Sequence, residues 1–530
     1  MKNNFLKTED DTVKLQINFD KDEHFYGGAV NDGVFMPYRA GFSRDLRVWH
    51  AGNQAASAII SDRGRAIVSA QPFSYELGEG VLTVTGKKIR CLSCGDTLKS
   101  AYLGMRKFLY GGGTGGIPAK EMFSYPQYNT WIEMEWDCTQ EKVLSYARDI
   151  LAHGYPAGVL MIDDCWCRAY GDWDFDASRF PSPKGMVDEL HQMGFKVMLW
   201  CCPFVSPDTA IFRTLESSGA LVKTTKGDTA LCHWWNGYSA VLDLSCPQAK
   251  EWFSAQTGRL MREYGIDGFK LDAADPEYYP KDSVFFDGSQ RSFQASVWAS
   301  MGAEFAFNEL RVGFNSGGLP VANRLRDKNH SWTDDGLNTL VPDGIAMGLC
   351  GYPFLCPDMI GGGMVPDFHR EGFCFDSELF VRYCQIAAFF PMMQFSRAPW
   401  KMLCEREQEI CLAAVNLHVQ LRDYLIRTAE ACAVSGEPML RSLEYAFPHR
   451  GYAAIMDEFL LGEDILVAPQ LQKGGASRKV VIPEGEWEDI GGNRYREGTH
   501  VVPTPLERIP VFIKHRAGKA AHSVLVEVKV

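Results

Sequence analysis

Hydrophobic and polar positions divide the chain into three stretches with different periods. Up to about residue 110, apolar and polar residues alternate in short runs such as "SAIISDRGRAIVSA" and "FSYELGEGVLTVTG", which are separated by turn-forming residues. A period of two is typical of strands that bury one face. This stretch therefore predicts an N-terminal β-sandwich, residues 1–112, ending in the glycine-rich segment "YGGGTGGIP".

The middle stretch, residues 113–430, alternates apolar strands with amphipathic helices. One helix is predicted from Thr139 to Gly154, and another from its N-cap Ser182 to Gly194. The apolar face of the first is predicted to comprise Val143, Leu144, Ala147, Ile150 and Leu151. Strands such as "PAGVLMIDD" are continuously apolar, as buried parallel strands are.

Eight strands can be counted in this middle stretch. They are predicted in "QYNTWIEM", "PAGVLMIDD", "FKVMLWCCPF", "IDGFKLD", "LPVANRLR", the segment around "HSWTDD", "GYPFLCPD" and "AAFFPMMQF". Eight strands with intervening helices predict a (β/α)₈ TIM barrel. Alternation returns after Glu430, in "DILVAPQL", "RKVVIP", "GEWEDIGG" and "HVVPTPLERIPVFIK", which predicts a C-terminal β-sandwich domain over residues 431–530. The fold class is thus α/β, a TIM barrel flanked by β-domains.

Composition narrows the class of partner. The formal net charge is −12 and no lysine or arginine run is present, so nucleic acid is not expected as a partner. The N-terminus lacks the apolar core of a signal peptide and no 18-residue apolar run occurs, so we expect a cytoplasmic protein without a membrane partner. The 16 cysteines are scattered; one CxxC, Cys91 and Cys94, lacks a second ligand pair, so no metal site is expected.

Acidic side chains stand at the predicted C-terminal ends of the barrel strands, where barrel enzymes carry out catalysis. The polar and aromatic residues at these ends are Asp163, Asp164, Trp200, Asp272, Arg324, Arg326, Asp335 and Asp358. Sugar rings stack on indoles, and carboxylates accept hydrogen bonds from hydroxyl groups. Carboxylates and tryptophans without a histidine cluster therefore favour sugar chemistry, in which two further carboxyl groups act as nucleophile and general acid.

Each of these residues also has a purely structural explanation. Asp163 or Asp164 can be a strand-end acid bonded to backbone amides, and Trp200 can be a core residue. Asp334 and Asp335 can be a solvated pair in a loop. Lys270 and Asp272 share one face of their strand, so they either pair with each other or bind a ligand. The pattern alone leaves these alternatives open.

Several segments resemble glycoside hydrolase family 31. They are "MIDDCWCRAYGDWDFDASRFPSPKGMVDELHQMGFKVMLWCCPFVSPD", "GIDGFKLDAAD" and "SWTDDGLNTLVPDGIAMGLCGYPFLCPDMIGG", in the family's order and over nearly the whole chain. The family consists of retaining α-glycosidases with an N-terminal β-sandwich, a catalytic barrel and C-terminal β-domains. The segments "GYPFLCPDMIGG" and "FFPMMQFSRAPW" further resemble its α-galactosidase-like branch.

The resemblance implies roles for individual residues. Asp272 in "FKLD" matches the nucleophile, and Asp335 in "SWTDD" matches the general acid/base. Asp164 matches the acid that holds sugar hydroxyls, and Trp200 the tryptophan in the wall of that subsite. Lys270 replaces the tryptophan of typical α-glucosidases, as in the branch that cleaves α-xylosides and sulfonated sugars.

Other substrate contacts follow less directly from the same resemblance. Arg324 is matched to the arginine before the acid/base, with Arg326 as a competitor. The expected contacts also include Asp163, Trp332, Asp358, Gln394 and Ser396. Gln394 or Ser396 would stand near the place of the histidine by which family α-glucosidases hold the 2- and 3-hydroxyls. Asp334 stands where glycine is usual and Asp275 where glutamate is usual, so glucose specificity is put in doubt.

The expected function is that of a retaining exo-α-glycosidase acting on small oligosaccharides or glycosides, with α-galactosides ahead of α-glucosides. No cofactor or metal is expected, because two carboxyl groups suffice for the chemistry. A homo-oligomer is a possible assembly. The alternatives are an α-transglycosylase, in which a second sugar intercepts the ester intermediate, and a non-catalytic sugar-binding homologue.

Overall fold

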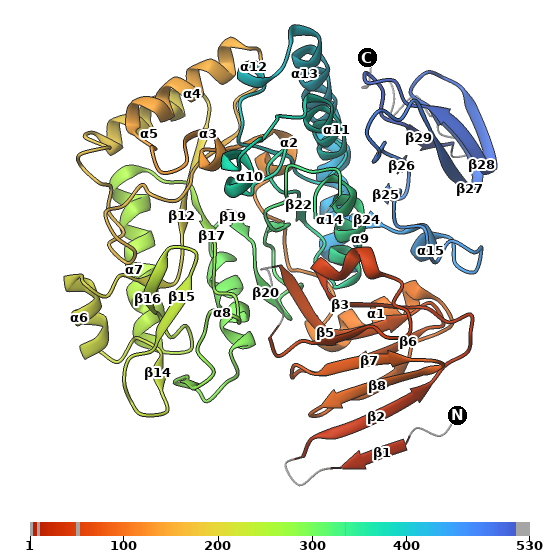
Figure 1. Ribbon diagram of the computed structural model, residues 1–530, viewed down its shortest axis with the longest axis horizontal. Coiled ribbons are helices and arrows are strands. Elements are labelled where there is room, and N and C mark those ends of the chain that lie inside the picture. The colour runs from red at the N-terminus through yellow and green to blue at the C-terminus, as the bar shows by residue number, and fades with distance from the viewer. Residues whose placement is uncertain (1–3, 8–10, 49–52, 334, 516–530) are drawn as a thin grey trace.

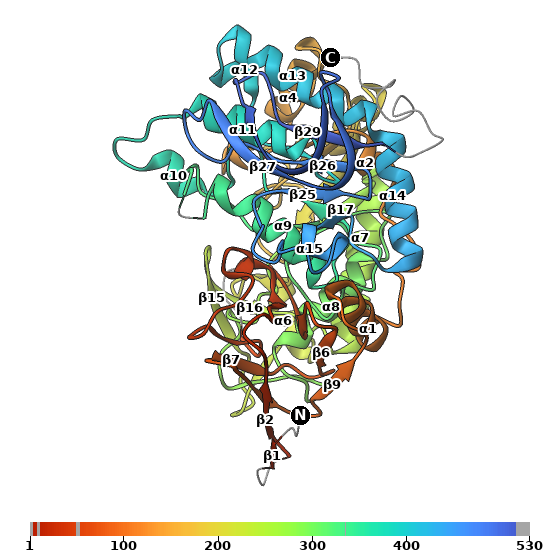
Figure 2. The ribbon, with the colours of Figure 1, turned by 90° about the vertical axis from the view of Figure 1, so that its right-hand side faces the viewer.

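The computed structural model describes residues 4–7, 11–48, 53–333 and 335–515. Along the chain, two N-terminal sheets are followed by a sheet of eight parallel strands and then by a C-terminal sheet (Figure 1). The N-terminal sheets lie in the lower half of Figure 2 and the C-terminal sheet in its upper half. Asp334, which the sequence marks as a departure, lies outside the described residues.

The N-terminal stretch forms the two sheets that the period-two pattern predicts. One sheet has the order β1 (Asn4–Lys7), β2 (Val13–Asn18), β8 (Val81–Gly86), β7 (Ser74–Gly78), β4 (Ser43–Asp45). The other contains β20 (Gly313–Phe314), β5 (Gln54–Ser61), β6 (Arg65–Val68) and β9 (Arg90–Ser93), with β3 (Phe25–Ala29) paired to β5. In β2, Leu15 and Ile17 are fully buried between exposed neighbours, so the alternation positions one face on the core.

A helix that the alternating pattern conceals follows these strands. α1 (Leu98–Tyr110) is capped at its N-terminus by Thr97, whose side chain accepts a hydrogen bond from the Ser100 backbone N–H. Gly111, with φ +75°, caps its C-terminus. The first glycine of "YGGGTGGIP" is thus a helix C-cap, where the left-handed conformation favours glycine. The helix carries the chain from the N-terminal sheets to the barrel.

The eight parallel strands confirm the predicted TIM barrel. Their order is β22 (Leu355–Cys356), β21 (Asn323–Arg324), β19 (Phe307–Leu310), β17 (Gly268–Leu271), β12 (Lys196–Cys201), β11 (Val159–Ile162), β10 (Gln127–Asn129), β23 (Gln394–Phe395). The two outermost strands are joined through the segment after β22, because the Ile360 N–H donates to the Gln394 carbonyl oxygen (2.8 Å). The strands are short, and their side chains are buried except for Lys196 at the start of β12.

Two of the predicted barrel strands are misplaced. The fifth strand is β19, "FNEL", and the predicted fifth strand in "LPVANRLR" contains the sixth, β21. The segment around "HSWTDD" is a loop among the described residues. Asn308 and Glu309 interrupt the apolar pattern of β19, yet both are buried, and Glu309 forms an ion pair with Arg324 (3.2 Å). A buried charge pair inside the barrel therefore conceals this strand from the hydrophobic pattern.

The helices around the barrel follow the predicted periodicity closely. α4 (Gln140–Ala152) begins after Thr139, whose Oγ1 accepts from the Lys142 N–H, but Leu151 is partly exposed rather than buried. The Ser182 side chain makes no capping hydrogen bond at the start of α5. The remaining helices of this part are α2 (Glu121–Ser124), α3 (Trp131–Met134), α5 (Pro183–Gln192), α6 (Ala210–Ser217), α7 (Pro247–Tyr264), α8 (Ser292–Gly302), α9 (Leu340–Leu349), α10 (Val365–His369), α11 (Ser377–Ala387) and α12 (Pro399–Met402).

Additional strands lie in the loops of the barrel. The antiparallel set β13 (Phe204–Val205), β16 (Gly237–Val241) and β15 (Leu231–Trp234) follows β12, and β14 (Lys223–Thr224) pairs with β18 (Ser283–Val284). The β15–β16 turn consists of Trp235 and Asn236. Both residues line the cavity at the ends of the barrel strands.

The C-terminal stretch forms one hydrogen-bonded sheet of six strands among the described residues, and its description as a sandwich stays a prediction. After α13 (Glu405–Gln420) and α14 (Arg422–Ser435), its strands have the order β24 (Leu440–Arg441), β25 (Phe459–Leu461), β26 (Ile465–Val467), β29 (Val511–Lys514), β27 (Ser477–Asp489), β28 (Arg494–Pro503). α15 (Leu443–Ala446) lies between the first two strands in sequence. "RKVVIP" and "GEWEDIGG" join into the one strand β27. The boundaries after residues 112 and 430 stay predictions.

Arg106 on α1 connects the N-terminal part to the barrel. Its buried guanidinium donates to the carbonyl oxygens of Gly112 (2.7 Å), Gly317 (3.0 Å) and Gly351 (2.5 Å). Arg106→Met should lower the free energy of unfolding by about 2–4 kcal/mol, because it leaves buried acceptors without donors. Equilibrium denaturation followed by tryptophan fluorescence measures the loss.

Lys107→Met is the matched control for this substitution. Lys107 is the exposed neighbour of Arg106 on the same helix, so its replacement should change the free energy of unfolding by less than about 0.5 kcal/mol. Equal effects of the two substitutions would contradict a structural role for the Arg106 guanidinium.

Candidate active site

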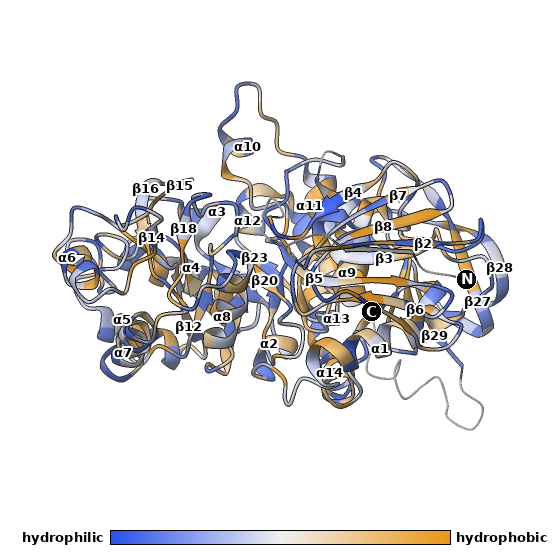
Figure 3. Cartoon of the chain, turned by 90° about the horizontal axis from the view of Figure 1, so that it is seen from below, coloured by the Kyte–Doolittle hydropathy of each residue, from blue (hydrophilic) through white to orange (hydrophobic). Residues whose placement is uncertain are grey.

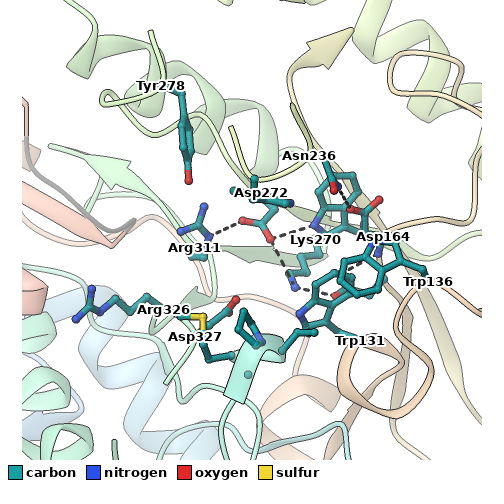
Figure 4. Close-up of a pocket in the computed structure, with 17 residues that line it drawn as sticks. Trp131, Trp136, Asp164, Asn236, Lys270, Asp272, Tyr278, Arg311, Arg326 and Asp327 are labelled. Carbon is teal, nitrogen blue, oxygen red and sulfur yellow. Dashed lines mark hydrogen bonds and ion pairs between the residues drawn. The ribbon is translucent and has the colours of Figure 1, made fainter. Parts of the chain in front are cut away.

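A cavity of about 410 Å³ lies at the C-terminal ends of the barrel strands (Figure 4). Among the described residues, its lining comprises Trp131, Trp136, Asp163, Asp164, Trp200, Trp235, Asn236, Lys270, Asp272, Tyr278, Arg311, Arg326, Asp327, Gly363, Met364, Val365 and Pro366. Six of the residues predicted from the sequence are in this list: Asp163, Asp164, Trp200, Lys270, Asp272 and Arg326. The cavity thus brings together acids that are distant in sequence.

Asp272 lies at the centre of the polar part of the cavity, directly after β17. Its Oδ1 accepts hydrogen bonds from Arg311 Nε (2.5 Å) and the Ala273 N–H (2.7 Å), and its Oδ2 accepts from Trp200 Nε1 (3.0 Å). The next residue, Ala273, has φ +57°, so the chain turns sharply after the acid. Trp200 is therefore more than a wall residue, because its indole N–H orients the carboxylate.

The surroundings of Asp272 keep its carboxyl ionised. Burial alone would raise the pKa, but the positive charges of Arg311 and Lys270 outweigh burial and hold the pKa of Asp272 below its usual range. Lys270 Nζ lies 3.7 Å from Asp272 Oδ2. A carboxylate held ionised and oriented by donors on both oxygens has the properties of a nucleophile.

Lys270 is held by a second acid. Its Nζ donates to Asp163 Oδ2 (2.7 Å), which also accepts from Asn129 Nδ2 (2.7 Å). Burial would lower the pKa of Lys270, but the negative charge of Asp163 raises it above the usual value. Lys270 is thus a fixed cation between two carboxylates. Its hydrogen bond goes to Asp163, and it contributes positive charge beside Asp272 on the same strand face.

Asp164 is held by two neighbouring side chains that lie outside β11. Tyr170 OH donates to its Oδ2 (3.0 Å), and Asn236 Nδ2 from the β15–β16 turn donates to the same atom (3.1 Å). Burial, together with the neighbouring charge of Asp163, raises the pKa of the Asp164 carboxyl to about 7. Its ionisation therefore changes near neutral pH, and in the ionised form it can accept hydrogen bonds from hydroxyl groups of a ligand.

Asp335, the predicted acid/base, is not part of the cavity lining. Its Oδ2 forms an ion pair with Arg326 Nη2 (2.5 Å), and its Oδ1 with Nζ of the fully buried Lys328 (2.8 Å). Lys328 Nζ also contacts Asp343 (2.6 Å). The Asp335 carboxylate is therefore the counter-ion of two cations and is absent from the cavity lining, and its role as acid/base stays a prediction.

Asp327 is the acid that lines the cavity on this side. Its side chain is one-third exposed, and its Oδ1 accepts from Arg324 Nη1 (2.8 Å). The buried Arg324 guanidinium also contacts Asp358 (2.7 Å). Arg324 and Arg326, between which the sequence cannot decide, thus have different roles, because Arg324 holds Asp327 from behind and Arg326 lines the cavity.

Four further predicted contacts have structural partners and do not line the cavity. Asp358 accepts from Arg324 and from the Lys328 N–H (2.7 Å). Trp332 Nε1 donates to Asp376 (2.9 Å), and Gln394 Nε2 donates to Glu309 (2.6 Å). Ser396 Oγ accepts from the Ile132 N–H (2.7 Å). Of these four, Asp358 is selected by its position after a strand, whereas Trp332, Gln394 and Ser396 are selected by the family resemblance.

Several lining residues come from segments that the pattern does not mark. Arg311 follows the strand that is concealed by Glu309, and Trp235 and Asn236 form a hairpin turn inside a barrel loop. The Arg311 guanidinium lies 5.4 Å from the centre of the Trp235 ring. The "WWNG" sequence of the turn, two aromatic residues before an Asn-Gly pair, is the one signal that could have indicated an aromatic hairpin tip.

Among the described residues, no group of three or more His, Cys, Asp or Glu side chains is arranged to hold a metal ion. Every cysteine of the sequence is a free thiol, including Cys91 and Cys94. Within the same described ranges, no helix is both long enough and apolar enough to cross a membrane.

Comparison with known proteins yields two family matches. Residues 117–303 and 322–428 match the glycosyl hydrolases family 31 TIM-barrel domain, and residues 436–517 match the glycosyl hydrolase family 31 C-terminal domain. The chain is 35% identical to the myogenesis-regulating glycosidase of Mus musculus over 415 residues, which cover 75% of this chain and 57% of that protein. It is 25% identical to a sulfoquinovosidase of Escherichia coli, covering 66% of this chain and 54% of that protein. The chain thus spans little more than half the length of these relatives.

Solved structures share the fold at lower sequence identity. An α-xylosidase from a soil metagenome, complexed with xylose, superposes with a TM-score of 0.84 at 24% identity, covering 99% of this chain and 82% of that chain. A sulfoquinovosidase from E. rectale, in complex with an aza-sugar inhibitor, has a TM-score of 0.85 at 19% identity, covering 98% and 84%. At these identities the likeness shows the common fold.

Proposed function

The chain belongs to glycoside hydrolase family 31, and on this premise we propose that it is a retaining exo-α-glycosidase. The proposed reaction removes the non-reducing α-linked sugar from a small oligosaccharide or glycoside through a covalent glycosyl-enzyme. The observation that carries this proposal is that the Asp272 and Asp327 carboxyl groups line one cavity. They come from different strand ends, after β17 and after β21.

Asp272 is the proposed nucleophile. Its carboxylate oxygen attacks the anomeric carbon as the bond to the leaving oxygen breaks, which forms a glycosyl ester. The Arg311 and Trp200 donors hold the carboxylate in one orientation before the reaction, so little reorganisation is needed. Lys270 supplies positive charge without occupying the nucleophilic oxygens, because its hydrogen bond goes to Asp163.

Asp327 is the proposed general acid and base, in place of Asp335. As an acid it gives its proton to the leaving oxygen, and as a base it takes a proton from the water that hydrolyses the ester. The exposed third of its side chain is compatible with access by water, and Arg324 fixes its orientation. Asp335, by contrast, is engaged by two cations and lies outside the lining.

The preferred sugar is proposed to be α-galactose, with α-glucose next. The sequence lacks the histidine by which family α-glucosidases hold the 2- and 3-hydroxyls, and neither Gln394 nor Ser396 lines the cavity in its place. Asp164 remains as an acceptor for sugar hydroxyls, and its contact with Asn236 ties it to the β15–β16 turn. The sugar specificity would then depend on this turn as well as on the strand ends.

A panel of p-nitrophenyl α-glycosides tests the proposal. The galactoside should be hydrolysed fastest, ahead of the glucoside, the xyloside and the sulfoquinovoside, and proton NMR should show the α-anomer of the sugar as the first product. Release of the β-anomer would exclude double displacement. Binding of sugars without turnover of any member would instead favour a non-catalytic protein.

Arg311→Gln should shift the acid limb of the pH profile to higher pH. The Arg311 charge lowers the pKa of Asp272, so its removal raises that pKa toward the usual carboxyl range or above. Because only the ionised nucleophile reacts, kcat/KM should then fall at a higher pH as the solution is acidified, by about one to three units. The pH dependence of kcat/KM for the best nitrophenyl substrate measures the shift.

Arg213→Gln provides the control for this shift. Arg213 is an exposed arginine on α6 and is absent from the cavity lining, so the same loss of charge should leave the acid limb in place. An unchanged acid limb in Arg311→Gln would contradict the assignment of Asp272 as the group that must be ionised.

A further inference from the structure

The two sides of the cavity differ in chemistry. The side around Asp272 carries Asp163, Asp164, Asn236, Lys270 and Arg311, whereas the segment that follows β22 contributes Met364, Val365 and Pro366. We propose that the side of the cavity that receives the leaving group accepts an apolar alkyl or aryl aglycone in preference to a second sugar. This inference rests on the proposed function. The substrates would then be simple α-glycosides rather than oligosaccharides.

The apolar segment lies on the side of the leaving group because it adjoins Asp327. The N–H groups of Gly363 and Met364 both donate to the carbonyl oxygen of Lys328 (3.1 and 3.2 Å), the residue directly after Asp327. The acid that protonates the leaving oxygen must lie beside the leaving group. Side chains attached to this stretch of backbone therefore face the aglycone rather than the sugar that is transferred.

The apolar wall, formed by Met364, Val365 and Pro366, is stabilised by packing against neighbouring residues. Val365 is buried in a small cluster with Ile132 and Met359, against which Trp131 and Phe368 pack. α10 projects from the body of the molecule, so the cluster holds a protruding segment against the cavity (Figure 3). Because α3 and α10 both contribute residues to the cluster, the apolar wall is held in place by packing between two helices.

Polar groups that could bind the hydroxyls of a second sugar are scarce on this side. Asp327 and Arg326 line this part of the cavity; one guanidinium nitrogen of Arg326 is paired with Asp335 (2.5 Å), and its Nε is buried without a hydrogen-bond partner. Met364, Val365 and Pro366 offer no side-chain donor, and a hydroxyl desolvated against them would lose its hydrogen bonds to water. An alkyl or aryl group pays no such penalty.

Two tryptophans extend this wall toward the cavity mouth. Trp131 and Trp136 lie edge to face with ring centres 5.5 Å apart, and Trp136 is 51% exposed. Indole faces stack on sugars as well as on apolar groups, so the tryptophans alone do not decide the aglycone. The preference for an apolar aglycone comes from the aliphatic residues beside Asp327, because they pack against an apolar surface and offer no hydrogen-bond donors to hydroxyl groups.

A series of alkyl α-glycosides of the sugar selected by the nitrophenyl panel tests the proposal. The alcohols of the methyl, butyl and hexyl members are similarly poor leaving groups, so differences in kcat/KM report the contact made by the alkyl chain. We expect kcat/KM to rise by about two- to fourfold per added methylene until the wall is covered. A cyclohexylmethyl glycoside should exceed the matching 1→6-linked disaccharide with glucose, whose ring has the same size, by about tenfold or more.

Met364→Gln should reduce the ratio of kcat/KM between the hexyl and methyl members by about threefold or more. Leu151→Gln, on the exposed face of α4 and outside the lining, should leave that ratio unchanged. A flat alkyl series, or a disaccharide better than its cyclohexylmethyl counterpart, would overturn the apolar aglycone while leaving the glycosidase in place. No turnover of any nitrophenyl or alkyl glycoside would overturn the proposed function and this inference together.

Discussion

Asp272→Ala is expected to lower kcat/KM by more than about 10⁴-fold on the best nitrophenyl glycoside, because the covalent ester can no longer form. The side chain is 8% exposed, and the donors from Arg311 and Trp200 hold its carboxylate in one orientation at the centre of the site. Initial rates measure the loss, and circular dichroism shows whether the variant retains its secondary structure.

Chemical rescue sharpens this experiment. Azide can enter the space left by the missing carboxyl and attack the anomeric carbon directly, so Asp272→Ala should recover activity in azide and release a β-glycosyl azide. Wild-type enzyme incubated with a slowly turned-over fluorinated glycosyl fluoride should carry the sugar on the peptide that contains Asp272. A label on another residue, or a rate within tenfold of wild type, would remove Asp272 from the role of nucleophile.

Asp267→Ala is the matched control. Asp267 lies just before the other end of β17 and contacts His191 (2.7 Å) and Lys196 (3.1 Å), outside the cavity lining. Its loss removes a carboxyl next to the same strand without removing one from the cavity. The variant should therefore be less stable than wild type, with kcat/KM within a few-fold of it.

The sequence predicts those parts of the site that continuous apolar strands position. β11, β12 and β17 are buried on both faces, so their apolar runs stand out, and the polar residues at their ends can be read from the sequence. Asp163, Asp164, Trp200, Lys270 and Asp272 all line the cavity. Where the strand pattern is clear, the residues at its end can be assigned.

The fifth barrel strand is concealed from the hydrophobic pattern by a charge buried within it. β19 contains Glu309, which is buried by pairing with Arg324, and a hydrophobic pattern cannot anticipate a charge that is neutralised by a residue elsewhere in the sequence. Because the pattern does not reveal β19, it gives β21 as the fifth strand and a loop as the sixth. The prediction for Asp335 rests instead on the resemblance of "SWTDD", whereas Asp327, eight residues earlier and after β21, lines the cavity.

The loop-borne residues of the site could not be placed for a different reason. Arg311, Asn236 and Met364 reach the cavity through turns, and their positions depend on tertiary contacts such as the Arg311–Asp275 ion pair (2.8 Å). Local periodicity carries no information about such contacts. The sequence therefore places the residues at the strand ends more readily than those that reach the cavity from loops.

Asp327→Ala and Asp335→Ala should separate the two candidate acid/base residues. For Asp327→Ala, kcat/KM on alkyl glycosides should fall by about 10²–10⁴-fold, because the leaving alkoxide needs a proton. The loss should be much smaller for p-nitrophenyl glycosides, whose leaving group departs unprotonated, and a burst of nitrophenol should precede slow hydrolysis of the ester. Azide should accelerate this second step and give an α-glycosyl azide.

Asp335→Ala should show the opposite pattern, a loss of stability without selectivity for the leaving group. Removing its carboxylate leaves Arg326 and the fully buried Lys328 short of a counter-ion, which should cost about 3–5 kcal/mol of the free energy of unfolding. Asp335→Asn, which keeps the shape of the side chain, should cost less and retain kcat/KM within about tenfold of wild type. The opposite result would be rescue of Asp335→Ala by azide together with unimpaired activity of Asp327→Ala. It would return the acid/base role to Asp335, because azide replaces the base-assisted water only when the acid/base residue is missing.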